Sequence, residues 1–207
     1  MQASRGTPVR VVISAALALT VLITGGSVAL SETETKSRTK TKTVKIRDDC
    51  EPTSFDAAVG PGTCVGDGET TFAEFIEELR EDRAVEAWRF SPRRFHVAAG
   101  TMLLLKSRGG ETHTFTKVAD FGGGFVAGLN ALSGNLVATP ECAVDLGGGQ
   151  LAPQPPSDTN IFVEAGETEA GPTAGSSILP VGKKARFQCC IHPWMHAVVT
   201  VTERHRD

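Results

Sequence analysis

The residues with the clearest capacity for chemistry lie near the C-terminal end of the chain, between Phe187 and Met195. A thiol, an imidazole and a thioether follow one another there at positions i, i+3 and i+6, as Cys189, His192 and Met195. Pro193 disfavours a helical conformation at the residue before it, so the segment is predicted to turn tightly after a strand that delivers Cys189. A thiolate, imidazoles and a long, weak thioether bond are the ligands of copper in electron-transfer sites, which need one further histidine from elsewhere.

At this motif the sequence resembles the cupredoxins, the blue-copper family of plastocyanin, amicyanin and pseudoazurin. The spacing Cys189-x-x-His192-Pro193-x-Met195 is similar to the short ligand loop of the amicyanin-like branch. The family's first histidine lies far upstream at the start of a strand, where this sequence has His113. The resemblance therefore implies that a single copper ion, cycling between Cu(I) and Cu(II), binds to His113, Cys189, His192 and Met195.

The resemblance extends over about 87–203 and includes a segment similar to the family's opening strand, Trp88 to Pro92. It implies an exported, mononuclear type 1 copper protein that carries single electrons, and not an enzyme with a small-molecule substrate. Protein redox partners are expected to dock near His192 and Trp194, because the histidine of this loop is the family's usual electron port. An apolar shell around the metal is expected from Phe115, Phe187 and Trp194. The alternative with the same ligands is an extracytoplasmic protein for copper storage or delivery.

The five cysteines leave at least one thiol unpaired if the others form disulfides. Adjacent residues on a strand point to opposite faces, so Cys189 and Cys190 are expected to have different roles. If Cys189 binds copper, Cys190 is free to pair with Cys142, and Cys50 can pair with Cys64. The remaining four cysteines allow three pairings, so this connectivity is one hypothesis among them.

Other interpretations of these residues are weaker. A zinc site could use Cys189, Cys190, His192 and His196, but zinc motifs usually place about two to four residues between their cysteines. The segment from Asp67 to Phe75 is similar to half of a calcium-binding loop, but the positions of the first carboxylates hold Thr63 and Val65. A sandwich that has lost its metal and serves only as an interaction module is the remaining alternative. The other histidines, His96, His196 and His205, are interpreted as ordinary surface or strand residues.

The N-terminal 1–29 is predicted to be a secretory signal peptide, because Arg5 and Arg10 precede an uncharged, largely apolar run that ends in small residues before Leu30. An uncleaved membrane anchor is the alternative. Either outcome places the rest of the chain outside the cytoplasm, in the periplasm or secreted. Residues 30–43 hold almost only Ser, Thr and charged side chains and are predicted to be a disordered linker. The net charge of −3 lacks the basic excess that a nucleic-acid-binding protein needs.

The fold class is predicted as all-β, a Greek-key β-sandwich of the cupredoxin type over 87–207. Short apolar segments separated by Gly and Pro favour strands at 87–90, 94–98, 101–107, 113–118, 185–190 and 197–203. The preceding 44–86 is predicted to be a small extension with one helix, which begins at a capping box formed by Thr71 and Glu74 and ends near Asp82. Residues 121–160 are rich in Gly and Pro and are predicted to be a long insertion between strands.

Overall fold

The computed structural model describes residues 39–204 of the chain. The predicted signal peptide or anchor, the linker residues 30–38 and His205 lie outside the described residues. Within 39–204 no helix has both the length and the apolar composition needed to cross a membrane.

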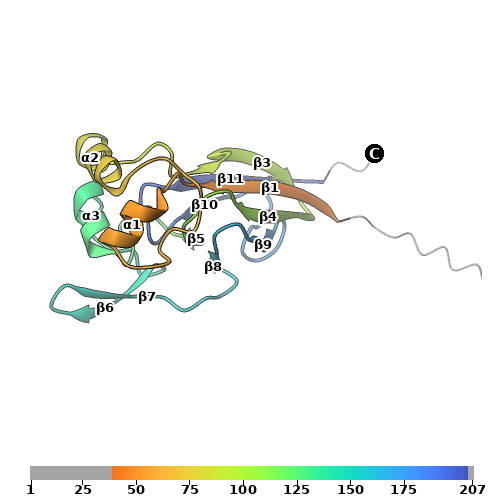
Figure 1. Ribbon diagram of the computed structural model, residues 1–207. Helices are drawn as coiled ribbons and strands as arrows, with labels where there is room; N and C mark the ends of the chain where they lie inside the picture. Colours follow the sequence, from red (N-terminus) through yellow and green to blue (C-terminus); the bar gives the residue numbers. More distant parts are fainter. Residues whose placement is uncertain (1–38, 205–207) are drawn as a thin grey trace, which may run out of the picture. The chain divides into compact units, whose positions relative to one another are not determined.

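Two β-sheets form the body of the protein (Figure 1). In spatial order, the first contains β2 (Arg89–Ser91), β1 (Lys40–Arg47), β4 (Thr101–Ser107) and β9 (Thr168–Thr173). The second contains β3 (Arg94–Ala98), β11 (His196–Thr202), β10 (Lys184–Gln188), β5 (His113–Val118) and β8 (Asn160–Val163). A separate hairpin pairs β6 (Ala143–Gly147) with β7 (Gln150–Pro153). The chain crosses between the two main sheets several times, from β2 to β3, from β3 to β4, from β4 to β5, from β8 to β9 and from β9 to β10, and the predicted Greek-key β-sandwich is confirmed.

The core lies between these sheets, and strands such as β4 and β11 bury every second residue. In β4 the buried positions alternate with half-buried ones throughout, and β11 has the same period of two. Phe90 from the first sheet meets Phe115 from the second edge to face, with ring centroids 5.2 Å apart. Phe115 in turn stacks on Phe187 of the neighbouring strand at 4.2 Å. These aromatic contacts join the two sheets near the start of β5 and the end of β10.

Three short helices gather at one end of the sandwich: α1 (Pro52–Ala58), α2 (Phe72–Asp82) and α3 (Ala127–Ser133) (Figure 1). The predicted capping box of α2 is present, because Thr71 and Glu74 each accept a hydrogen bond from the other's backbone N–H. The buried face of α2 carries Phe75 and Leu79. Phe75 packs on Trp88 with ring centroids 4.8 Å apart, which fixes the helix over the end of the sheets.

The structure corrects two predictions for the N-terminal part. Lys40 to Thr43 are not part of a disordered linker: they begin β1, which pairs with β4 in parallel and with β2 in antiparallel orientation inside the first sheet. Residues 44–86 are consequently no appendage to the sandwich, and they contain two helices where one was predicted. The unforeseen α1 begins with Pro52 in its first turn and with the Glu51 carboxylate accepting hydrogen bonds from two backbone N–H groups.

The predicted strand bounds agree closely with β3, β4 and β5 and within about two residues with β2, β10 and β11. The insertion contains α3 and the β6–β7 hairpin, and its last residue, Asn160, begins β8. The side-chain amide of Asn130 exchanges hydrogen bonds with the backbone of Gly124, which ties α3 to the loop before it. The insertion is therefore folded against the rest of the protein.

Candidate metal centre

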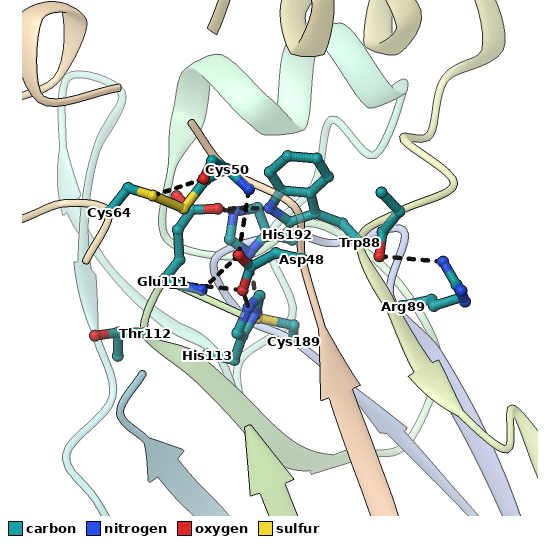
Figure 2. A network of polar contacts seen from close by, with 12 residues as sticks. Asp48, Cys50, Cys64, Trp88, Arg89, Glu111, Thr112, His113, Cys189 and His192 are labelled. Atoms are coloured by element: carbon teal, nitrogen blue, oxygen red, sulfur yellow. Dashed lines mark hydrogen bonds and ion pairs between the residues drawn. A yellow bond between two sulfur atoms is a disulfide. The ribbon is translucent and has the colours of Figure 1, made fainter. Parts of the chain in front are cut away.

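Three predicted ligands lie together at the helical end of the sandwich (Figure 2). His113 is the first residue of β5, and Cys189 and His192 belong to the loop between β10 and β11. The Cys189 Sγ lies 3.7 Å from Nδ1 of His113 and 3.7 Å from Nδ1 of His192. One sulfur and two nitrogen donors thus face one another in a fully buried space, with a ligand atom of each within 4.8 Å of the others.

The loop that carries Cys189 and His192 is closed by its own backbone. Cys189 donates its N–H to the carbonyl of Met195 at 3.1 Å, and Met195 donates to the carbonyl of His192 at 2.9 Å. The side chain of Met195 is 1% exposed. The fourth predicted ligand is therefore buried on the same tight loop, while its role as a ligand remains a prediction.

Hydrogen bonding favours the thiolate form of Cys189. Burial raises the pKa of this thiol, but the two imidazoles that face the sulfur outweigh burial and lower the pKa well below its usual range. The backbone N–H of Thr114 also points at the sulfur, at 3.4 Å. A buried thiolate beside two imidazole nitrogens is a soft and borderline donor set of the kind that copper binds.

The other nitrogen of His113 is held by a carboxylate. Nε2 lies 2.7 Å from Oδ2 of Asp48, and both side chains are fully buried. Burial lowers the pKa of His113, but the hydrogen bonds to Asp48 and Cys189 outweigh it and raise the pKa to about 10. Burial raises the pKa of Asp48, and the contact with His113 together with two backbone N–H groups reverses this and lowers it.

A second buried carboxylate, Glu111, lies beside His192. Its Oε2 accepts a hydrogen bond of 2.5 Å from Nε1 of Trp88 and lies 3.5 Å from Nε2 of His192. Burial raises the pKa of Glu111, against the attraction of the two histidines. Neither imidazole of the site therefore leaves its outer nitrogen open to water.

The expected exposed electron port at His192 is not present in this structure. His192 is 2% exposed, and Pro193 is buried too. The ring of Phe75 on α2 lies 6.3 Å from the His192 ring, and Trp194 lies 5.4 Å from it. Phe75, which belongs to the predicted extension 44–86, thus helps to cover the histidine that the family resemblance placed at the surface.

The cysteine pairing follows the hypothesis drawn from the sequence. Cys50 is bonded to Cys64 and Cys142 to Cys190, which leaves Cys189 as the free cysteine. The disulfide at Cys190 removes one of the four donors that the zinc alternative required. His196, another of those donors, stacks its ring on Phe121 at 3.8 Å. A second grouping of Asp48, Cys50 and Glu111 has no thiolate to offer, because Cys50 is oxidised.

Sequence reasoning missed Asp48, Glu111 and Phe75 as neighbours of the site. Asp48 is separated from His113 by 65 residues and belongs to no recognisable motif. Glu111 stands in a bend two residues before His113, and this closeness in sequence was an available signal. Phe75 lies on the helix that the capping box predicted, but no sequence pattern related that helix to the histidines.

The chain matches no protein-family model and no curated protein. It is similar to the solved structure of a purple cupredoxin from Nitrosopumilus maritimus, with a TM-score of 0.31 and 14% sequence identity, over 57% of this chain and 86% of that one. It is also similar to the structure of auracyanin B, with a TM-score of 0.34 and 13% sequence identity, over 79% of this chain and 88% of that one. An oxidised plastocyanin from Dryopteris crassirhizoma is a further match, with a TM-score of 0.29 and 13% sequence identity, over 78% of this chain and 100% of that one. TM-scores this low identify no function, which has to come from the site's own residues. These three matched structures are cupredoxins.

Proposed function

We propose that this protein is an exported, mononuclear type 1 copper protein that carries single electrons between protein redox partners and catalyses no reaction of its own. His113, Cys189, His192 and Met195 would hold the ion. The observation that supports the proposal best is the fully buried convergence of the Cys189 thiolate with Nδ1 of both histidines.

The chemistry of this donor set suits copper. Thiolate and thioether sulfur favour Cu(I), whereas imidazole is a good ligand for Cu(II), so a bound ion would exchange an electron with few changes in its ligands. The lowered pKa of Cys189 keeps its sulfur ionised, as metal binding requires. The buried loop around it holds the ligands in place and excludes water from them.

The burial of the site favours electron transfer over copper delivery. An acceptor that takes copper must reach the ligands and replace them, but His113 and Cys189 are 0% exposed and His192 is 2% exposed. An electron needs no such access. Trp194 is the half-buried residue of the ligand loop whose ring lies beside His192, so we place the docking site for redox partners around Trp194.

The test is addition of Cu(II) to the purified, metal-free protein. We expect one copper per chain and an intense visible absorption from thiolate-to-copper charge transfer, with copper retained through reduction and reoxidation. Cys189→Ser should abolish the band, because an alcohol cannot replace the thiolate. A colourless wild-type protein, or rapid loss of Cu(I) to a soluble acceptor with no stable redox couple, would contradict the proposal.

A further inference from the structure

We infer that Asp48 is the positioning residue of this copper site, because its carboxylate fixes the ring of His113 with Nδ1 facing the metal. The inference rests on the proposed function. Asp48 follows directly after β1, in a part of the chain that the family resemblance did not cover.

The carboxylate of Asp48 is itself held by backbone donors. Oδ1 accepts a hydrogen bond of 2.8 Å from the N–H of Gly110, and Oδ2 accepts one of 3.3 Å from the N–H of Glu111. A weaker contact of 3.5 Å joins Oδ1 to the N–H of Cys50. With three backbone N–H groups aimed at it, the carboxylate has little freedom to turn away from His113.

This arrangement selects one tautomer of His113. An ionised carboxylate only accepts hydrogen bonds, so Nε2 has to carry the proton in the contact of 2.7 Å with Asp48. A neutral ring then has its lone pair on Nδ1, the nitrogen that faces Cys189. Asp48 therefore sets both the orientation of the ring and the nitrogen that is available to a metal.

An amide cannot replace this carboxylate. Every atom that approaches the two Asp48 oxygens is a donor, so the NH₂ group of an asparagine would face either the backbone N–H of Gly110 or Nε2 of His113. The second orientation would reverse the tautomer and place a proton on Nδ1, where the metal binds. Asp48→Asn thus keeps the volume of the side chain but removes its positioning function.

The close approach of Asp48 to the backbone depends on Gly109. A Cβ at this position would lie 2.0 Å from Oδ2 of Asp48, closer than such atoms approach. Gly109→Ala consequently displaces the carboxylate and leaves its charge in the protein. Gly128 on α3 has no neighbour within 4 Å of the corresponding position, so Gly128→Ala is a matched control.

Glu111 provides a comparison that separates position from charge. It is also a buried carboxylate beside a predicted ligand, but its distance of 3.5 Å from His192 Nε2 exceeds that of an ordinary hydrogen bond. Glu111→Gln removes a buried carboxylate beside His192 without removing a hydrogen bond of normal length to that imidazole. Its effect on copper affinity should be smaller than that of Asp48→Asn.

The experiment compares wild type with these variants by two measurements. Copper affinity, determined by competition with a chelator at several pH values and corrected for the proton that copper displaces from His113, should fall by about 10- to 100-fold in Asp48→Asn and in Gly109→Ala. In the proton NMR spectrum of the diamagnetic Cu(I) form, wild type should show a slowly exchanging, downfield Nε2–H of His113, and both variants should lose it. Gly128→Ala should match wild type in both measurements.

Failure of copper binding and failure of the role of Asp48 give different results in this experiment. If wild type binds no copper, the proposed function fails and this inference fails with it. If wild type binds copper and either folded variant keeps both the protected Nε2–H and an affinity within twofold of wild type, the inference alone is overturned. Should Asp48→Asn fail to fold, Gly109→Ala decides, since it retains the carboxylate. An affinity loss in Glu111→Gln as large as in Asp48→Asn would show that charge, and not position, is responsible.

Discussion

A proton and a metal ion compete for the same nitrogen, Nδ1 of His113. Its raised pKa, about 10, means that in the metal-free protein the imidazole stays protonated at neutral pH. Binding of copper to Nδ1 has to displace that proton, whereas the Cys189 sulfur is already ionised because its pKa is lowered. The affinity of the site for copper is therefore linked to pH through His113.

We predict that the apparent copper affinity rises by about tenfold per pH unit from pH 7 towards pH 10 and then levels off. The sign follows from protonation: at each lower pH more protein holds the His113 proton that copper must release. Proton release measured with an indicator dye in weakly buffered solution, alongside chelator competition at several pH values, checks this. An affinity that stays constant between pH 7 and pH 9 would show that His113 is neutral before copper arrives.

At the scale of single elements, α2 acts as a lid over His192 through Phe75. We predict that Phe75→Ala lowers the free energy of unfolding by about 3–5 kcal/mol, because a buried aromatic ring is lost, and speeds the loss of copper to a chelator. Leu79→Ala is the matched control: it is 0% exposed on the same helix face, one turn further along, and should destabilise without the same gain in copper loss. Equal rates of copper loss in the two variants would argue against a lid at Phe75.

The strands that deliver the ligands could be predicted because their signal is local. Short apolar segments between Gly and Pro predicted the positions of β4 and β5, and the capping box predicted the start of α2. β1 was missed because its first residues, Lys40 to Thr43, are mostly exposed polar side chains whose place in the sheet depends on pairing with β4. α1 was missed because seven residues carry too short a pattern.

The site could be predicted only where its residues are close in sequence or follow a known spacing. Cys189, His192 and Met195 share one loop, and His113 was found through the family resemblance. Asp48 interacts with His113 across two different sheets, so no local pattern could reveal it. The burial of His192 was missed for the same physical reason, since it results from packing of α2 against a distant loop.

At the scale of the whole molecule, two disulfides connect the site to the parts of the chain around it. Cys142–Cys190 links the insertion to the residue next to Cys189, and Cys50–Cys64 lies between Asp48 and α2. Their sequence separations are 48 and 14, so loop-closure entropy gives stabilisations of about 4 and about 3 kcal/mol.

We predict that replacing both cysteines of the longer link by serine costs about 4 kcal/mol in the free energy of unfolding, about 1 kcal/mol more than the same change at Cys50 and Cys64. Denaturant unfolding of the metal-free double variants measures both values. The visible band should remain in both variants where they are folded, because neither pair contributes a ligand. Loss of the band in folded protein would assign a disulfide sulfur to the metal site.

The position of β1 determines which end of the sandwich would face away from an attachment at the start of this strand. The chain enters the described fold at Lys40 and reaches Asp48 only after the eight residues of β1, a path of roughly 25 Å. β1 begins at the end of the sandwich away from the helices, and β11 finishes at that end as well (Figure 1). Any attachment there would point the end with the candidate metal centre outward, free to meet other proteins, and would spare it from contact with the surface that bears the attachment.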